Sequence, residues 1–128
     1  MILLGLSRAG KTSVGRLLAE RLCCPFYDTD ELIRIRTGLT PRQLYRQSGV
    51  SALHAAEAAA LRECCGLDFA AGIEEKTISA VIAAGGGICD NAEASAIIAA
   101  IPQRVFLYAE EAALFERLTH DALQTGYY

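Results

Sequence analysis

The feature that most constrains this chain is a glycine-rich motif that follows its first apolar run. Residues 5–12 read Gly-Leu-Ser-Arg-Ala-Gly-Lys-Thr, match the pattern G-x-x-x-x-G-K-[ST], and follow the apolar residues 1–4. A strand that passes through such a loop into a helix is typical of sites for nucleoside triphosphates. The alternative is an ordinary glycine turn before a helix, which the four fixed positions argue against.

Each residue type in this motif suits a polyphosphate. Gly5 and Gly10 allow a tight turn that brings backbone N–H groups close to anionic oxygens, and the next helix adds the positive end of its dipole. Lys11 supplies a mobile positive charge for the β- and γ-phosphates, and the Thr12 hydroxyl is suited to bind Mg²⁺. The motif therefore predicts a nucleoside triphosphate, with Mg²⁺ as its cofactor.

Length and charge fit a single domain over residues 1–128. The net charge is −3 and the pI is about 5.3, so no basic surface indicates nucleic acid as a partner. No apolar run reaches the roughly 18 residues of a membrane span, and the N-terminus has no secretion signal. We therefore expect a cytoplasmic monomer without nucleic-acid or membrane partners.

The cysteines occur as two adjacent pairs and a single residue, namely Cys23, Cys24, Cys64, Cys65 and Cys89. They lack the C-x-x-C spacing of zinc sites. An odd count in a chain of cytoplasmic type favours reduced, mostly buried thiols over a metal site or disulfides.

Strand-like and helix-like segments alternate along the chain, which predicts a parallel sheet covered by helices. Thr29 is a candidate N-cap, Gly38 ends a helix, and Gly49 separates two helices. The run Ile78–Ala84 has the continuous apolar character of a central strand buried on both faces. The predicted strands are 2–6, 26–27, 78–84 and 104–108, and the predicted helices are 12–22, 29–36, 40–48, 51–66, 91–100 and 111–119.

Two aspartates, in the sequence Asp28-Thr29-Asp30, follow the second predicted strand. Ligands of such sheets gather beyond the carboxyl ends of the strands, so the pair should lie near the phosphate loop. Residues two apart in a strand point to one side, and one carboxylate can steady Mg²⁺ while the other accepts a proton from an attacking hydroxyl. The alternative is an N-cap aspartate with an acidic first helical turn.

Three consecutive glycines, Gly85, Gly86 and Gly87, follow the third predicted strand. At the same edge of the sheet, their lack of side chains would let a ligand touch backbone N–H groups. A flexible turn is the alternative, and the position at the sheet edge favours substrate contact.

In this order, the three signals resemble the shikimate kinase family, small phosphate-loop kinases of aromatic amino-acid biosynthesis. The resemblance covers nearly the whole chain, through residues 2–5, 10–16, 26–30, 49, 57, 81–87 and 105–108. It implies a three-layer α/β P-loop kinase fold with a central parallel sheet. It also implies an ATP-dependent enzyme that transfers the γ-phosphate to the 3-hydroxyl of shikimate with Mg²⁺.

The resemblance assigns roles to single residues. Lys11 and Asp30 would be catalytic, with Asp30 as the base, and Thr12 and Asp28 would hold the metal. Glu57 would brace a substrate-binding neighbour. The nucleotide-binding set would be Gly5, Arg8, Ala9, Gly10, Lys11, Thr12, Ser13 and Arg117, and the substrate-binding set would be Asp30, His54, Glu57, Gly85, Gly86 and Gly87.

The sequence departs from the family at His54, where the family has an arginine that clamps the substrate carboxylate. An imidazole cannot give the two-pronged grip of a guanidinium, although Glu57, one helical turn on, could stabilise a charged ring. A surface histidine paired with a glutamate is the alternative. Arg8 is a second departure, because it stands where the family usually has another loop glycine.

The third departure is the ending of the sequence. Family members continue through a mobile lid with an arginine, a helix with a further arginine, a fifth strand and a closing helix. Residues 118–128 contain no arginine or lysine and would form a partial lid. We expect either a truncated chain or a family member with weakened activity, because a lid excludes water from the transfer.

Three functional hypotheses follow. The first is a shikimate kinase, and the second is a nucleotide-binding module without transferase activity. The third is a kinase for another small polyol such as gluconate, because His54 weakens the case for a carboxylate substrate. Asp30, Glu57 and the glycine triplet favour the first hypothesis, since binding of ATP alone would not require them.

Overall fold

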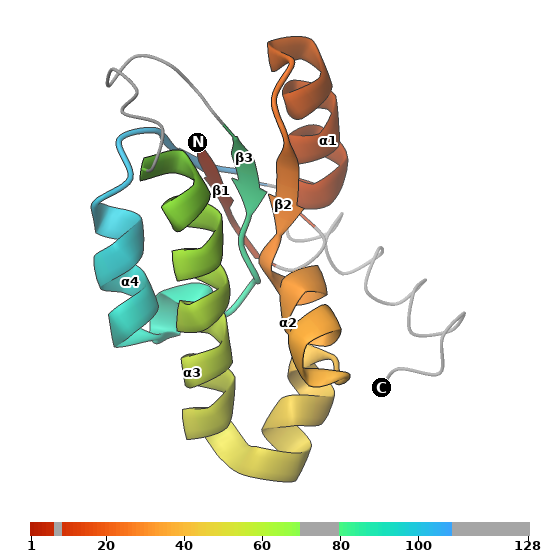
Figure 1. Cartoon of the computed structure of the whole chain (residues 1–128), viewed down its shortest axis with the longest axis vertical. Coiled ribbons are helices and arrows are strands. Elements are labelled where there is room, and N and C mark those ends of the chain that lie inside the picture. Colours follow the sequence, from red (N-terminus) through yellow and green to blue (C-terminus); the bar gives the residue numbers. More distant parts are fainter. Residues whose placement is uncertain (7–8, 70–79, 109–128) are drawn as a thin grey trace.

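The computed structural model describes residues 1–6, 9–69 and 80–108, and its core is a parallel four-stranded sheet (Figure 1). The strand order is β2-β3-β1-β4. The strands are β1 Ile2–Leu4, β2 Phe26–Asp28, β3 Val81–Ala83 and β4 Arg104–Phe106. The helices are α1 Lys11–Leu22, α2 Thr29–Thr37, α3 Pro41–Phe69 and α4 Ala92–Ala99, with a short 3₁₀ helix η1 at Ile88–Asp90.

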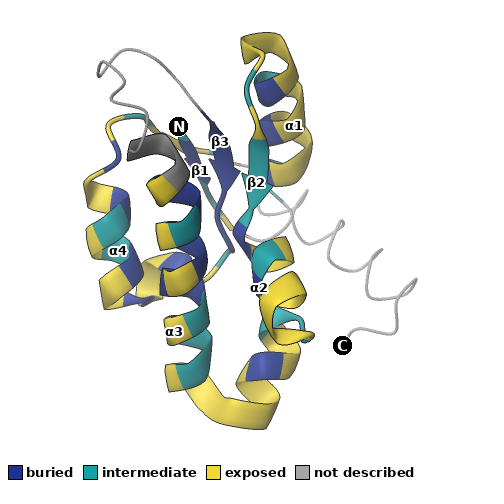
Figure 2. Ribbon diagram, in the orientation of Figure 1, coloured by how far each residue is buried: buried dark blue, intermediate teal, exposed yellow. Residues whose placement is uncertain are grey.

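Helices cover both faces of this sheet, with α1 on one side and α3 and α4 on the other (Figure 1). Side chains of β1 and β3 alternate between the two layers. Ile2 and Ile82 pack in a cluster with residues of α3 and α4, while Leu3 and Val81 pack with Ala19 of α1. β1 and β3 are the buried strands in Figure 2, and every residue of β3 is buried. These observations confirm the predicted three-layer α/β fold.

Helix α1 lies close to the edge strand β2 because Gly15 has no side chain. A Cβ atom at Gly15 would lie 2.4 Å from Cε2 of Phe26. The guanidinium of Arg16 stacks over the same ring, 5.4 Å from its centroid, which is within the range of cation–π attraction. The packing of α1 on β2 places the loop before α1 next to the end of β2.

Helix α3 combines two of the predicted helices into one element with a kink. Gly49, at φ 86° and ψ −178°, is non-helical inside it, as expected for a residue that tolerates positive φ. The helix also continues to Phe69, beyond the predicted end near residue 66.

The end of β2 differs from the prediction in one important detail. Asp28, not Thr29, is the N-cap of α2, and its Oδ1 accepts the backbone N–H groups of Asp30 and Glu31 at 3.0 and 3.4 Å. The prediction that Thr29 caps this helix is wrong because its hydroxyl accepts a hydrogen bond from Gly85 instead. Asp30 therefore lies in the first turn of α2 rather than in a strand.

Other boundaries are shorter than predicted. β1 ends at Leu4, β4 ends at Phe106, and α4 runs from Ala92 to Ala99 behind the N-cap Asn91. The short η1 helix after the glycine triplet has too few residues to produce a periodic sequence pattern. The predicted helix 111–119 lies outside the described residues.

The cysteines are less buried than predicted. Only Cys64 and Cys65 are buried, whereas Cys23 and Cys89 are exposed, so the prediction of mostly buried thiols is wrong. No disulfide joins any of the five cysteines, all of which lie in the described residues.

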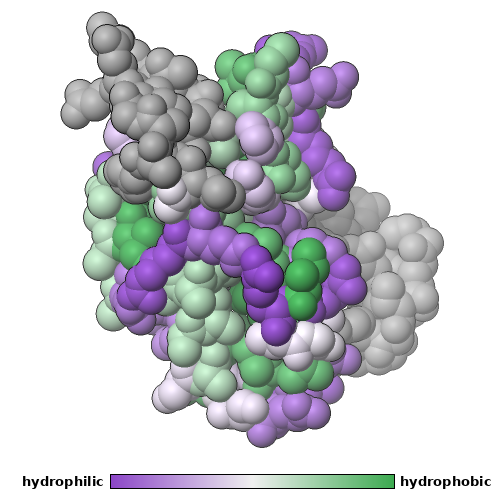
Figure 3. All heavy atoms as spheres, in the orientation of Figure 1, coloured by the Kyte–Doolittle hydropathy of each residue, from purple (hydrophilic) through white to green (hydrophobic). Residues whose placement is uncertain are grey.

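Ion pairs connect the helices on the outer surface. Arg36 of α2 pairs with Glu63 of α3, and Arg62 of α3 pairs with Glu93 of α4. Figure 3 shows hydrophilic residues intermixed with hydrophobic ones on the face that these helices form. Such exposed pairs contribute little to stability, typically below about 1 kcal/mol each. Within the described part of the chain, no helix has the length and apolar character of a membrane span.

Candidate phosphate-transfer site

The loop between β1 and α1 requires glycine at two positions. Gly5 has φ 149°, and a Cβ atom there would lie 2.6 Å from the carbonyl oxygen of Leu107. Gly10, at φ 96° and ψ 17°, is the N-cap of α1 in the left-handed region. L-residues with side chains rarely adopt these conformations. The glycine pattern that predicted the loop therefore has a direct backbone cause.

Lys11 begins α1 and turns its side chain back over this loop. Its Nζ donates hydrogen bonds to the carbonyl oxygens of Gly5 and Leu6 at 2.7 and 2.8 Å. Burial lowers the pKa of Lys11, and the negative charges of Asp30 and Asp28 act in the opposite direction. The Lys11 ammonium group is thus hydrogen-bonded to the phosphate loop and interacts electrostatically with both aspartates.

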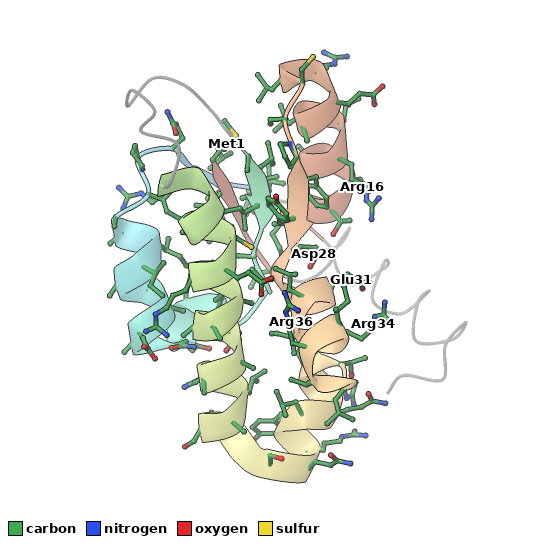
Figure 4. All side chains as sticks on the ribbon, in the orientation of Figure 1. Met1, Arg16, Asp28, Glu31, Arg34 and Arg36 are labelled. Carbon is green, nitrogen blue, oxygen red and sulfur yellow. The ribbon has the colours of Figure 1, made fainter. Side chains whose placement is uncertain are left out.

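Thr12 and Asp28 are the two residues that the sequence analysis predicted to hold the metal. The Thr12 hydroxyl donates to Oδ2 of Asp28 at 3.0 Å, and Figure 4 shows Asp28 where β2 enters α2. The other oxygen of Asp28 caps α2, so this carboxylate is held from two sides. Mg²⁺ favours a carboxylate or hydroxyl oxygen together with phosphate oxygens and water. The donor set therefore fits Mg²⁺.

Asp30 has the most perturbed carboxyl group of the site. Burial of the carboxyl, the charges of Asp28 and Glu57 and the opposing charge of Lys11 together raise its pKa to about 6, and burial is the largest cause. The residue as a whole is still exposed at the surface, so its carboxyl is both shielded by neighbours and reachable. A pKa near the working pH suits a general base.

The glycine triplet lies directly against this carboxyl group. A Cβ atom at Gly85 would lie 2.6 Å from Oδ1 of Asp30. The N–H of Gly85 donates to the hydroxyl of Thr29 at 3.0 Å, so this N–H is already used within the protein. Gly86 is half-buried and Gly87 is exposed. Thr29 is fully buried. Its predicted role was the N-cap of α2, whereas its observed role is to hold the glycine triplet.

His54 and Glu57 lie one helical turn apart on α3. Glu57 is 6% exposed, and burial raises its pKa, while a hydrogen bond from Asn91 and the charge of His54 lower it and Asp90 raises it. Glu57 is buried and His54 is half-buried, so the two side chains are not a fully exposed surface pair. Asn91 was not among the predicted site residues. An isolated asparagine before an apolar helix signals only an N-cap.

An open cavity of about 650 Å³ runs beside the Thr12–Asp28 pair along α1 and β2. Its lining consists of Thr12, Arg16, Ala19, Glu20, Cys24, Phe26, Asp28 and Glu31. It does not include Lys11, Asp30 or the glycine triplet, so it reaches the predicted metal ligands but not the predicted base. Figure 4 shows Arg16 and Glu31 near Asp28 on this side.

The structure brings most of the predicted residues to one edge of the sheet. The phosphate loop, the Asp28–Asp30 pair and the glycine triplet follow β1, β2 and β3, which are adjacent parallel strands. Ala9 is half-buried in the loop, and Ser13 is exposed in the first turn of α1. Arg8 and Arg117 lie outside the described residues.

A parallel sheet with helices on both faces, a glycine loop ending in Lys-Thr and carboxylates at the next strand are the features of the P-loop kinase fold. The family model described as shikimate kinase matches residues 8–124. The chain therefore belongs to the shikimate kinase family.

Similar proteins agree with this assignment. The chain is 37% identical over 119 residues to shikimate kinase of Dechloromonas aromatica, covering 93% of this chain and 60% of that protein. It is 35% identical over 117 residues to shikimate kinase of Symbiobacterium thermophilum, covering 91% of this chain and 62% of that protein.

Solved structures show the same likeness. The solved structure of shikimate kinase from Acinetobacter baumannii in complex with shikimate matches with a TM-score of 0.78 and 29% identity, covering 94% of this chain and 62% of that chain. The chain thus spans about 60% of the length of these relatives.

Proposed function

We propose that this chain carries the nucleotide and substrate groups of a shikimate kinase and transfers the γ-phosphate of ATP to the 3-hydroxyl of shikimate. The observation that carries the proposal is Asp30, whose carboxyl lies against Gly85 and has its pKa raised to about 6. At pH 7.5 this group is mostly ionised and can accept the proton of an alcohol.

In the proposed reaction, the hydroxyl oxygen of the substrate forms a bond to the γ-phosphorus, and the bond from that phosphorus to the bridging oxygen breaks. Asp30 takes the hydroxyl proton and ADP leaves. Lys11 compensates negative charge on the phosphoryl group. When bound, Mg²⁺ neutralises charge on the β- and γ-phosphate oxygens, and Thr12 and Asp28 are the residues that would hold it.

On the substrate side, the residues that we assign to the bound shikimate are Asp30, His54, Glu57, Gly85, Gly86 and Gly87. His54 stands where the family has an arginine for the substrate carboxylate, so we expect weaker carboxylate binding than a guanidinium would give. The nucleotide assignments of Gly5, Arg8, Ala9, Gly10, Ser13 and Arg117 stay predictions. So do the cytoplasmic location, the monomeric state and the absence of nucleic-acid and membrane partners.

The test is release of ADP from ATP and Mg²⁺ by the 128-residue chain, with and without shikimate. We expect shikimate to increase the rate, and the Asp30→Asn variant to abolish the increase. The same rate with and without shikimate would reject the proposal. Calorimetry then separates the two hypotheses, because a nucleotide-binding module would bind ATP but not shikimate. Gluconate in the same assay tests the polyol alternative raised by His54.

A further inference from the structure

Asn91 is a buried polar residue at the exit of the glycine segment. It is 2% exposed and directly follows η1, which leads from Gly87 into α4. Its Oδ1 accepts the backbone N–H of Ala94 at 3.1 Å, which makes it the N-cap of α4. Serine, threonine or aspartate could make this cap equally well, so the cap alone does not explain an asparagine.

The side-chain NH₂ of Asn91 makes contacts that the cap does not need. It donates to the carbonyl oxygen of His54 at 2.8 Å and to Oε1 of Glu57 at 3.5 Å. The Ala94 N–H fixes this orientation, because a reversed amide would place a donor against a donor. One side chain therefore joins the segment after the glycine triplet to helix α3 at His54 and Glu57.

We propose that Asn91 is a positioning residue for the substrate side of the site, because its amide holds the Glu57 carboxylate and the His54 backbone against the glycine segment. The description of this region as the substrate side rests on the function proposed above. The contact between Asn91 and Glu57 does not depend on that function.

The charges around Glu57 explain why an amide is needed there. Burial favours the neutral carboxyl, Asp90 of η1 adds negative charge, and Asp30 of α2 feels the charge of Glu57 in turn. The hydrogen bond from Asn91 and the charge of His54 act in the opposite direction and lower the pKa of Glu57. A neutral donor can stabilise the ionised carboxylate in a buried place without adding charge to the site.

Two variants separate the amide from the cap. Asn91→Ser keeps an oxygen for the Ala94 N–H but lacks the NH₂ group. Asn91→Asp also keeps this oxygen and the side-chain shape, but places a second carboxylate beside Glu57. The control is Ser95→Ala in the first turn of α4. It removes the hydrogen bond of 3.0 Å that the Ser95 hydroxyl donates to the carbonyl oxygen of Cys89. Circular dichroism and thermal unfolding check that each variant folds.

The first measurement is the pKa of Glu57 in the whole chain, followed through its side-chain carboxyl carbon by NMR. We expect Asn91→Asp to raise this pKa by about one unit or more, because two adjacent carboxylates cannot both ionise freely. Asn91→Ser should raise it by less, and Ser95→Ala should leave it unchanged. The second measurement is shikimate binding by calorimetry, where both Asn91 variants should lose affinity several-fold and Ser95→Ala should not.

The Glu57 pKa and the shikimate affinity test separate parts of the proposal. An unchanged Glu57 pKa in both Asn91 variants would overturn the positioning role, whatever happens to binding. A shifted pKa with unchanged shikimate affinity would overturn its connection to the substrate. If the unaltered chain binds no shikimate but the pKa shifts as expected, the proposed function fails while the positioning of Glu57 by Asn91 stands.

Discussion

At the scale of single residues, the site brings negatively charged carboxylates close together, which costs the folded chain stability. Burial raises the pKa of the Asp30 carboxyl most, the negative charges of Asp28 and Glu57 raise it as well, and the positive charge of Lys11 lowers it. A raised carboxyl pKa means that the native state holds a proton more tightly than the unfolded chain does. Stability from this group is therefore complete below about pH 4 and is lost as the pH rises through about 6.

The first prediction concerns Asp30→Asn. The shift from 3.8 to about 6 corresponds to a penalty of at most about 3 kcal/mol above pH 7, which exposure of the residue reduces to about 1–2 kcal/mol. We expect the variant to be more stable by this amount at pH 8 and equally stable at pH 4. Urea unfolding at the two pH values measures it. Transfer to shikimate should fall by about 10²–10⁴-fold. Equal stabilities at pH 8 would contradict the charge argument.

The second prediction concerns the contact between Gly85 and Asp30. In Gly85→Ala, the new Cβ would meet Oδ1 of Asp30 at 2.6 Å, so the carboxylate must move. We expect a loss of about 1–3 kcal/mol in unfolding free energy and a larger loss in kcat than in ATP affinity. Thr29→Val removes the hydroxyl that accepts the Gly85 N–H, and Thr29→Ser keeps it. Activity near the unaltered level in Thr29→Val would show that this hydrogen bond does not position the triplet.

At the scale of elements, the same residues serve both a helix end and the site. Asp28 caps α2 with one oxygen and accepts the Thr12 hydroxyl with the other. The two interpretations of the Asp28–Asp30 pair, as a helix cap and as a site for metal and base, are therefore compatible. A carboxylate fixed by backbone N–H groups needs no further ordering before it meets a ligand.

The third prediction separates these roles. Asn is as good an N-cap as Asp, so Asp28→Asn should keep the stability of α2, whereas Asp28→Ala should lose about 1 kcal/mol. Both variants should need more Mg²⁺ for ATP binding, since both lack the carboxylate charge. Thermal unfolding and ATP titrations at several Mg²⁺ concentrations measure the two effects. An unchanged Mg²⁺ requirement in both variants would remove Asp28 from the metal site.

The fourth prediction concerns the contact of α1 with β2. Gly15→Ala places a Cβ 2.4 Å from the Phe26 ring, so α1 must shift, at a cost of about 1–3 kcal/mol. Gly66→Ala in α3 is the control, because no atom of the described residues lies within 4 Å of its Cβ position. It should stabilise the chain by about 0.5–1 kcal/mol through helix propensity. The same sign of change in both variants would contradict the close approach of α1 to β2.

At the scale of the whole molecule, the sheet and its two helical layers hold the three loops of the site together. Ile82 and Val81 are adjacent in β3 but belong to clusters on opposite faces, toward α3 and α4 and toward α1. β3 also pairs with both β1 and β2. Loss of packing around β3 should therefore displace both the phosphate loop and the Asp28–Asp30 segment.

The fifth prediction tests this arrangement with Ile82→Ala. Ile82 is 1% exposed, and truncation of such a side chain typically costs about 2–5 kcal/mol. This is a large share of the stability of a small domain. Ile35→Ala, at a side chain that is 60% exposed, is the control and should change stability by no more than about 0.5 kcal/mol. Urea unfolding measures both, and similar losses would contradict the assignment of the core.

Much of the site was readable from residue types in order along the chain. Gly5 and Gly10 signal a backbone conformation, and Lys11 with Thr12 signals phosphate chemistry, because these depend on local geometry. Asp28 and Asp30 could also be named as candidates for the metal ligand and the base, because they directly follow a predicted strand. The raised pKa of Asp30 could not be predicted, since it depends first on burial of the carboxyl in the folded chain and also on the charge of Glu57 of α3, which lies far away in sequence.

The sequence by itself determined the phosphate loop, the alternation of strands and helices and the family, because each depends on a local pattern or on the order of motifs. Only the tertiary structure decided that Thr29 accepts the Gly85 N–H, that Asp28 both caps α2 and meets Thr12, and that Asn91 reaches Glu57. These contacts join segments that are distant in sequence, and parallel strand pairing brings them to one edge of the sheet. No local pattern specifies which of several polar groups will meet there.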